Sequence, residues 1–323
     1  MNILITGAFG FLGRRLFARL LDAGHLRDSS GNVQPVEKII LSDIETPARH
    51  GIDDPRIEVV QGDLADASFV DRLITPDISS VFHLGSLVSG GAEQDFVLGM
   101  NANFLGTWNV LDASRKAGNA PKVVFTSSIA AYGGKLPSVL SDDQRLTPES
   151  SYGVQKAIGE LLVAEFTRKG YIDGRSVRLP IVAIRPGKAN TAASSWASAI
   201  VREPLAGEDY VCPVGPSDSA FLLSPKKAIE GLIIAHETDA DLWGNDRSVM
   251  MAGLTCTPRQ MVDSLERIAG RDVADRVKWG NDPFIRTIVN SWPNSFSLEK
   301  ATRLGFQRDS SVDAIIQDYM ETI

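Results

Sequence analysis

The sequence opens with NILITGAFGFLG at residues 2–13, an apolar run followed at once by three evenly spaced glycines. The run at 2–6 predicts a buried strand, and the periodicity of 11–23 predicts a helix that begins within the glycine motif. Glycines in such a turn let the backbone approach a pyrophosphate, and the first helical turn offers free N–H groups. A glycine-rich turn without a ligand is the alternative, but the flanking strand and helix disfavour it. The expected cofactor contacts here are Gly7, Gly10, Phe11, Leu12 and Gly13.

The alternation of strands and helices continues through the first half of the chain. Further strands are expected at 38–42, 57–61, 80–84, 122–127 and 178–185, and further helices at 67–74, 101–117 and 152–169. The strands are short and rich in Val and Ile, as expected for parallel strands that are buried on both faces. This pattern predicts an α/β fold with a Rossmann-type doubly wound parallel sheet. The polar stretch at 27–35 is interpreted as a surface insertion.

Two acidic residues at strand ends bear on the choice of dinucleotide. Asp43 ends the second strand, where its carboxylate can accept hydrogen bonds from the adenosine ribose and would repel a 2′-phosphate. The cofactor is therefore expected to be NAD, although Arg14 and Arg15, interpreted as a solvated helix face, could in principle meet a phosphate. Asp63 and Leu64 follow the third strand and could contact the adenine; a helix-capping role for Asp63 is equally consistent.

The strand–helix rhythm changes after Pro186, which suggests two domains. Residues 1–187, with 220–255 returning to the core, are expected to form the NAD-binding domain. A smaller substrate-binding lobe is expected from 188–219 and 256–323. Within these parts, 247–252 is expected to be a late strand, and 257–270 and 312–322 are expected to be helical.

The composition of the 323-residue chain excludes several other classes. The net charge of −7, without a local basic run, disfavours nucleic acid as a partner. No apolar run is long enough to cross a bilayer, and the start lacks the pattern of a signal peptide, so a cytoplasmic protein with no membrane partner is expected. The two cysteines, Cys212 and Cys256, fit reduced thiols, and the four scattered histidines make a metal site unexpected.

A tyrosine and a lysine lie four positions apart in YGVQK at 152–156, on one face of an expected helix. An ammonium beside a phenol stabilises the phenolate, so Lys156 is expected to lower the pKa of Tyr152. Such a tyrosine can remove the proton of a substrate hydroxyl while hydride passes to a nicotinamide. Ser128 follows the preceding strand, where its hydroxyl could hydrogen-bond the reacting oxygen. Because YxxxK occurs by chance in many helices, the hypothesis rests on the three residues together.

These motifs resemble the extended short-chain dehydrogenase/reductase family, which includes the NDP-sugar epimerases and dehydratases. The resemblance is carried by the glycine motif, Asp63, Ser128, Tyr152, Lys156 and RPG at 185–187, and it continues to LGF at 304–306. Within the family, the likeness is greatest to members that oxidise D-erythronate. It rests on VFTSSIAAYGG (124–134), SSYGVQKAIGELL (150–162), RLPIVAIRPGKANTAASSW (178–196), REPLAGEDYVCPV (202–214) and HLGSLVSGGAEQDF (83–96).

The resemblance implies NAD-dependent oxidation of D-erythronate at C2, giving 2-dehydro-D-erythronate. It implies that Tyr152 is the base, that Lys156 holds the nicotinamide ribose, that Ser128 positions the substrate and that Asn103 belongs to a proton-relay scaffold. Leu84, Gly85, Ser86, Ile184 and Pro186 are expected to lie against the cofactor. HLGS at 83–86 departs from the HLAA of many relatives, so Ser86 is a candidate contact to cofactor or substrate, whereas His83 is interpreted as a packed residue.

A small sugar acid needs a site for its carboxylate. Hydroxyl and N–H groups at a helix start suit an anion, although they could equally cap and solvate the helix. The candidate substrate contacts are Ser86, Ser89, Ser128, Lys188, Asn190, Ser194 and Ser195. Of these, Ser89 lies in a glycine-containing segment that is as consistent with a plain turn.

Two other functions stay open. An NDP-sugar epimerase would keep NAD tightly bound; a dehydratase is disfavoured because Ile129 and Ala130, rather than acidic residues, follow Ser128. A non-catalytic NAD(P)-sensing regulator is disfavoured by the intact Ser128, Tyr152 and Lys156. By analogy with relatives, a homodimer through the helices at 101–117 and 152–169 is expected, although packing on the sheet explains their apolar residues as well.

Overall fold

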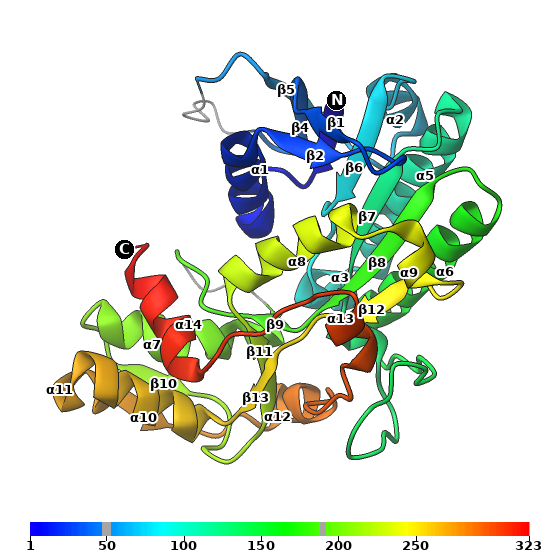
Figure 1. The fold of residues 1–323 in the computed structure, drawn as a ribbon. Helices are drawn as coiled ribbons and strands as arrows, with labels where there is room; N and C mark the ends of the chain where they lie inside the picture. Colours follow the sequence, from blue (N-terminus) through cyan, green and yellow to red (C-terminus); the bar gives the residue numbers. More distant parts are fainter. Residues whose placement is uncertain (47–52, 188–191, 323) are drawn as a thin grey trace.

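The computed structural model describes residues 1–46, 53–187 and 192–322, and a seven-stranded sheet forms its centre (Figure 1). In spatial order its strands are β12 (Ser248–Met250), β8 (Asp173–Leu179), β7 (Lys122–Ser128), β6 (Ile78–His83), β1 (Asn2–Thr6), β4 (Lys38–Asp43) and β5 (Ile57–Gln61). Every neighbouring pair is parallel. The winding direction reverses between β1 and β6, and a crevice at such a reversal is the usual ligand site. The predicted Rossmann-type doubly wound sheet is confirmed.

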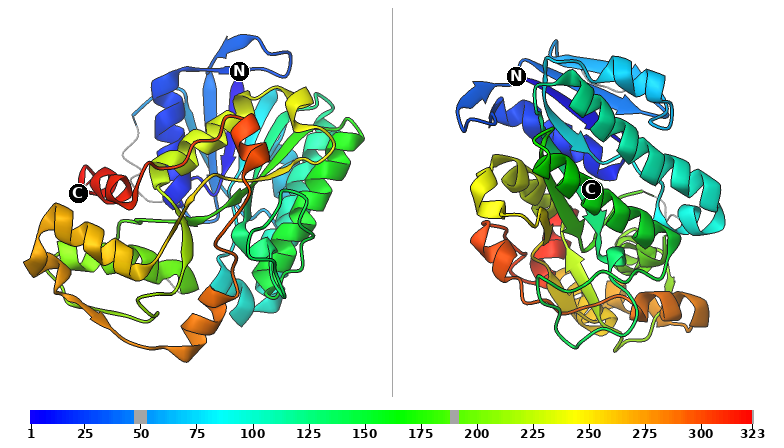
Figure 2. Two further views of the ribbon diagram at one scale, coloured as in Figure 1. Left: turned by 60° about the horizontal axis from the view of Figure 1, so that its bottom comes forward. Right: turned by 90° about the vertical axis from the view of Figure 1, so that its right-hand side faces the viewer.

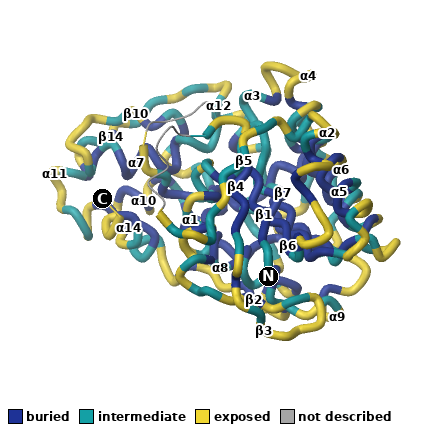
Figure 3. Tube along the Cα trace, turned by 90° about the horizontal axis from the view of Figure 1, so that it is seen from above, coloured by how far each residue is buried: buried dark blue, intermediate teal, exposed yellow. Residues whose placement is uncertain are grey.

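Helices cover both faces of the sheet (Figures 1 and 2). On one face, α1 (Phe11–Ala23) and α8 (Pro225–Glu237) share a core with Ile3 and Ile5 of β1. On the other face, α2 (Ala67–Leu73), α5 (Gly106–Ala117) and α6 (Ser151–Arg168) pack against Leu4 of the same strand. Successive side chains of a strand point to opposite faces, so each strand serves two cores. Figure 3 shows the central strands as buried.

Most predicted elements lie where the sequence places them. The bounds of β1, β5 and α1 agree with the prediction, and those of β4, β6, β7, α2 and α6 differ by at most two residues. The helix expected at 101–117 is divided into a π-helical segment, η1 (Met100–Leu105), and α5. The polar insertion forms an antiparallel hairpin of β2 (His25–Arg27) and β3 (Val33–Pro35).

The strand predicted at 178–185 is wrong in its bounds. β8 already runs from Asp173 to Leu179, and it ends before Pro180, which has no N–H group to donate to a sheet. The chain then leaves the central sheet and forms β9 (Ile181–Val182), which pairs with β11 (Ala220–Leu223). β13 (Leu254–Cys256) completes this smaller sheet.

The later part of the chain packs around a separate apolar core beside the large sheet (Figure 2). The remaining elements are α3 (Ser89–Gln94), α4 (Phe96–Gly99), η2 (Ile129–Ala131), η3 (Ala193–Ser195), α7 (Trp196–Leu205), β10 (Tyr210–Cys212), α9 (Ala240–Trp243), α10 (Pro258–Ala269), α11 (Arg271–Ala274), β14 (Val277–Trp279), α12 (Pro283–Asn290), α13 (Glu299–Arg303) and α14 (Val312–Met320). β10 and β14 pair in parallel. Within the described ranges, no helix has both the length and the apolar character that a bilayer span requires.

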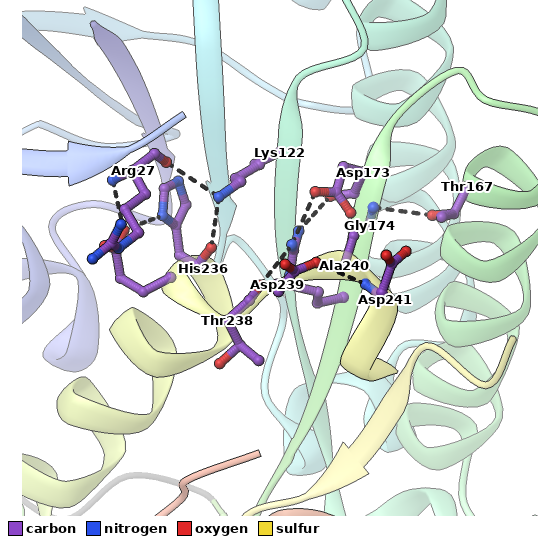
Figure 4. A network of polar contacts seen from close by, with 12 residues as sticks. Arg27, Lys122, Thr167, Asp173, Gly174, His236, Thr238, Asp239, Ala240 and Asp241 are labelled. Carbon is purple, nitrogen blue, oxygen red and sulfur yellow. Dashed lines mark hydrogen bonds and ion pairs between the residues drawn. The ribbon is translucent and has the colours of Figure 1, made fainter. Parts of the chain in front are cut away.

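Buried charged side chains lie at the amino-terminal ends of the central strands (Figure 4). Lys122, the first residue of β7, donates from Nζ to the carbonyl oxygens of Arg27 (3.2 Å) and His236 (3.1 Å). At the start of β8, Arg175 donates to the carboxylate of Asp173 at 2.9 Å. These contacts hold the hairpin and the end of α8 against the amino-terminal ends of the strands. The opposite, carboxyl ends of the strands remain available for a ligand site.

Candidate active site

The glycine motif brings two loops into close contact at the carboxyl ends of β1 and β6. Gly7 has a φ of 66°, and a Cβ atom there would lie 2.6 Å from the backbone nitrogen of Gly85. A Cβ atom on Gly13 would lie 2.3 Å from the carbonyl oxygen of Gly7. α1 begins at Phe11 with no capping side chain and no acidic residue in its first turn. Its first N–H groups can therefore receive an anion, and this cradle fits the pyrophosphate of NAD.

Asp43 lies beside the glycine motif. Its Oδ2 accepts a hydrogen bond from the backbone N–H of Phe9 at 2.9 Å, and its Oδ1 accepts one from Ile44 at 2.8 Å. Each carboxylate oxygen keeps a second lone pair, so the side chain can still accept from a ribose. The carboxylate that would select the cofactor thus also fixes the loop that would hold the pyrophosphate.

Asp63 does not cap the helix that follows it. Its Oδ1 accepts from the N–H of Ala65 at 2.9 Å, whereas Asp66 is the N-cap of α2 and accepts from Ser68 at 2.9 Å. The capping alternative is therefore wrong. Leu64 packs against the loop after β6, since a Cβ atom on Gly85 would lie 2.9 Å from its Cδ1.

Ser128, Tyr152 and Lys156 line one cavity of about 350 Å³ together with the glycine motif. Lys156 donates from Nζ to the carbonyl oxygen of Thr126 at 2.8 Å, and this nitrogen lies 5.5 Å from the centre of the Tyr152 ring. The Oγ of Ser128 accepts from the N–H of Ala130 at 3.1 Å. The three residues that the sequence selects are thus brought together by β7 and α6.

Burial has the largest effect on the pKa values of Tyr152 and Lys156. It raises the pKa of Tyr152, and the hydroxyls of Ser86 and Ser128 oppose that rise. Burial also lowers the pKa of Lys156 to about 7, against the carboxylate of Glu160, which raises it. The pKa of Tyr152 is therefore raised and not lowered as expected, because the loss of water around the phenolate has the largest effect.

Asn103 does not line the cavity, but it holds residues that are adjacent in sequence to lining residues. Its Oδ1 accepts from the N–H of Leu87 at 2.7 Å, and its Nδ2 donates to the carbonyl of Leu87 (3.1 Å) and to Oε1 of Gln155 (2.7 Å). Asn103 thereby joins the loop after β6 to the residue before Lys156. It lies in the π-helical segment, a distortion that often accompanies functional sites.

His83 is buried at the end of β6, as the sequence analysis expects, within a chain of hydrogen bonds. Its Nδ1 lies 2.7 Å from Oγ1 of Thr6 and its Nε2 lies 3.0 Å from Oγ1 of Thr107. The N–H of Gly85 donates to Thr6 at 3.2 Å, which directs the Thr6 proton to Nδ1 of His83. Burial, and then the charge of Lys156, lower the pKa of His83 to about 3. His83 is therefore a neutral positioning residue.

The wall opposite Tyr152 differs from the prediction. Ile184 is fully buried in the core of the later part of the chain, and neither Ile184 nor Pro186 lines the cavity. Because the strand ends before Pro180, the lining residues are the earlier Leu179, Pro180, Ile181 and Val182, together with Arg185. The proline within the apolar run was the signal in the sequence that could have placed this wall.

A second cavity, of about 600 Å³, adjoins the first and shares Ser89, Ala130, Ala192 and Trp292 with it. Its lining includes the acidic residues Glu93, Glu149 and Asp282 and the apolar residues Phe284, Ile285 and Ile288. Leu84 and Ser86 line only the first cavity, as does Ser194, whereas Ser195 lines the second. The expected contacts Lys188 and Asn190 lie outside the described residues. The α12 wall and Trp292 carry no motif that sequence reasoning could have used.

Residues 3–216 match the family described as the NAD dependent epimerase/dehydratase family. The chain is also 47% identical to a D-erythronate dehydrogenase of Cupriavidus necator over 321 residues, covering 99% of this chain and 98% of the relative. The chain belongs to the NAD dependent epimerase/dehydratase family. This member of the family is an oxidoreductase that uses NAD. The glycine cradle fits that cofactor.

Two further relatives cover nearly the whole chain. A D-erythronate dehydrogenase of Haemophilus influenzae is 40% identical over 323 residues, which cover 99% of each chain. The crystal structure of a nucleoside-diphosphate-sugar epimerase from Agrobacterium tumefaciens superimposes with a TM-score of 0.93 at 38% identity, covering 99% of this chain and 94% of that one.

Proposed function

We propose that the protein oxidises the C2 hydroxyl of D-erythronate to 2-dehydro-D-erythronate and reduces NAD⁺ to NADH. The single observation that carries the proposal is the alignment of the chain, end to end, with two proteins named D-erythronate dehydrogenase. The geometry supports it, since Ser128, Tyr152 and Lys156 line one cavity with the glycine cradle.

In this proposal Tyr152 is the base. When bound, NAD⁺ supplies the acceptor for the hydride that leaves C2 of the substrate. Tyr152 takes the proton of the C2 hydroxyl, and the hydroxyls of Ser128 and Ser86 hold the reacting oxygen. Lys156, fixed by the carbonyl of Thr126, holds the nicotinamide ribose. With a pKa of about 7 it can also accept a proton at working pH.

In this proposal the carboxylate of the substrate binds on the side of the first cavity that Ser194 lines. The adjoining cavity is lined by the carboxylates of Glu93, Glu149 and Asp282, which would repel an acid. Ser89 borders both cavities and would contact the rest of the substrate. By their position in the sequence, Lys188, Asn190 and Ser195 are further candidates. A Lys188→Met variant should raise KM for the acid more than KM for NAD⁺.

An NDP-sugar epimerase is the second candidate, favoured by the Agrobacterium neighbour. A sugar nucleotide carries a pyrophosphate, which needs cations. Among the described residues that line the larger cavity there are three carboxylates and no lysine or arginine. This charge pattern favours the smaller acid.

The test is NAD⁺ reduction, followed as NADH absorbance, across four-carbon and six-carbon sugar acids and UDP-sugars. We expect D-erythronate to give the highest kcat/KM and free NADH to accumulate. Turnover confined to UDP-sugars without release of NADH would show an epimerase. No turnover of any compound, together with NADH binding, would favour a cofactor-sensing regulator.

We also propose that two copies associate through α5 and α6. The exposed faces of these helices carry Trp108 (40% exposed), Val154 (40%) and Leu161 (71%), which a partner copy would cover. Sedimentation of wild type and Leu161→Glu tests this. A dimer that Leu161→Glu dissociates is expected, and a wild-type monomer would refute the assembly.

A further inference from the structure

The guanidinium of Arg185 lies in the cofactor cleft beside the start of α1. Its Cζ is 5.3 Å from the centre of the ring of Phe11, the first residue of that helix. Arg185 lines the same cavity as Gly10 and Leu12. The side chain therefore reaches the turn whose N–H groups have no capping side chain.

α7 fixes the backbone of Arg185 on both sides. The N–H of Arg185 donates to Oγ of Ser198 at 3.0 Å, and its carbonyl oxygen accepts from Nη1 of Arg202 at 2.9 Å. Both partners are buried residues of α7. The direction in which the Arg185 side chain leaves the backbone is thus set by a rigid element, as a preorganised binding residue requires.

Arg185 has a cationic neighbour, Arg202, and its own charge is unpaired by any carboxylate among the described residues. Arg202 is paired with Glu203 at 2.5 Å, whereas in the part of the chain that the structure describes no carboxylate pairs with Arg185. Burial, and then Arg202, lower the pKa of the Arg185 guanidinium. A partly buried cation without a partner is unfavourable, and an anion bound in the cleft would relieve this cost.

We propose that Arg185 binds the pyrophosphate of the dinucleotide across the cleft from the first turn of α1. The planar guanidinium can donate two parallel hydrogen bonds to a phosphate, and Gly10 and Leu12 of the turn line the same cavity. The carboxylate of the substrate is the other anion that could reach the cleft. The position over Phe11 favours the pyrophosphate. The inference rests on NAD as cofactor and is independent of which sugar acid is oxidised.

The test is the Kd of NADH, measured by its fluorescence without any substrate, for wild type and Arg185→Met. Loss of a bidentate charged contact should raise Kd about 10- to 100-fold. The binding of ADP-ribose, which keeps the pyrophosphate, should weaken to the same extent in Arg185→Met, whereas the binding of adenosine should not change. Arg185→Lys keeps the charge but cannot donate two parallel hydrogen bonds, so its Kd for NADH should lie between those of wild type and Arg185→Met.

Arg19→Met is the matched control. Arg19 also lies on α1, but it pairs with Asp22 on the exposed face of the helix and does not line the cavity, so NADH binding should not change. An unchanged Kd of NADH in folded Arg185→Met, verified by circular dichroism, would overturn the proposal. So would a rise confined to the KM of the sugar acid. If Arg185→Met does not fold, wild-type affinity in Arg185→Lys would overturn it. Failure to oxidise D-erythronate would leave these binding results standing.

Discussion

Glu160 and Arg178 form a buried bidentate ion pair that joins the elements of the site. Arg178 donates from Nε to Oε1 at 2.9 Å and from Nη2 to Oε2 at 2.6 Å. Glu160 lies one turn after Lys156 on α6 and accepts from Ser127, the residue before Ser128. Arg178 precedes Leu179 on β8 and also donates to the hydroxyl of Tyr132 at 2.7 Å. The pair therefore connects both walls of the cleft.

Replacing Glu160 by Gln should destabilise the protein by about 3–5 kcal/mol, because it leaves the Arg178 charge buried without a partner. Urea unfolding measures this. Glu165→Gln is the control on the same helix, since its pair with Arg168 is exposed, and no change in the free energy of unfolding is expected. Equal stability of both variants would show that the buried pair has no such role.

Replacing Tyr152 by Phe should lower kcat by about 10²- to 10⁴-fold, the usual contribution of a general base. The Kd of NADH should be unchanged, because only the hydroxyl is removed. Steady-state kinetics and a fluorescence titration give the two values. Retention of most of the activity would exclude Tyr152 as the base.

Replacing Ser86 by Ala should raise the pKa of Tyr152, because the Ser86 hydroxyl opposes the effect of burial. The base acts as phenolate, so the acidic limb of the kcat/KM profile should move to higher pH. Ser79→Ala, at the other end of β6, is the control because its Oγ donates only to the carbonyl of Asn2. Superimposed profiles for Ser86→Ala and wild type would contradict this role.

Replacing Asp43 by Asn should reduce the preference for NAD⁺ over NADP⁺ by about tenfold, which corresponds to one charge-assisted contact of about 1.4 kcal/mol. The amide keeps an oxygen for the N–H of Phe9 but no longer repels a 2′-phosphate. The ratio of kcat/KM for the two cofactors is the measurement. Equal or better efficiency of the wild type with NADP⁺ would refute the assignment.

The stability of the protein should fall as the pH drops below about 6.5. His83 has a folded pKa of about 3 against 6.5, so between these values only the unfolded chain takes up the proton. Between pH 7 and pH 5 this proton uptake lowers the free energy of unfolding by about 2 kcal/mol, and the His83→Gln variant should lack that part of the decrease. The pKa of buried His236 is lowered too, so a residual slope is expected. Parallel curves for wild type and His83→Gln, from urea unfolding at each pH, would contradict this.

The sequence predicts the sheet and the proximity of Ser128, Tyr152 and Lys156 well because both depend on local signals. Apolar runs between turn residues locate the strands, and the spacing of Tyr152 and Lys156 needs only one helix. Ser128 joins them because parallel strands end at a common edge. These signals do not depend on contacts between distant segments.

The second cavity is not predictable in this way. Its lining comes from α3, the loop before α6, the start of α7 and α12, and no single segment carries its shape. The error at Ile184 has a similar origin, because β-branched and apolar residues continue past Pro180 and conceal the change of sheet. Gln155 and Arg185 make contacts that only the folded chain creates.

Just after β8 ends, the chain passes from one sheet to the other along the cleft. Leu179 is the last residue of β8, while Ile181 and Val182 pair with β11 in the smaller sheet, and all three line the cavity. A dinucleotide bound in the cleft would therefore contact residues of both sheets. We expect the proposed acid to bind more tightly to the NAD-loaded protein than to the free protein, and thermodynamic reciprocity then requires that the acid tighten the binding of NAD by the same factor.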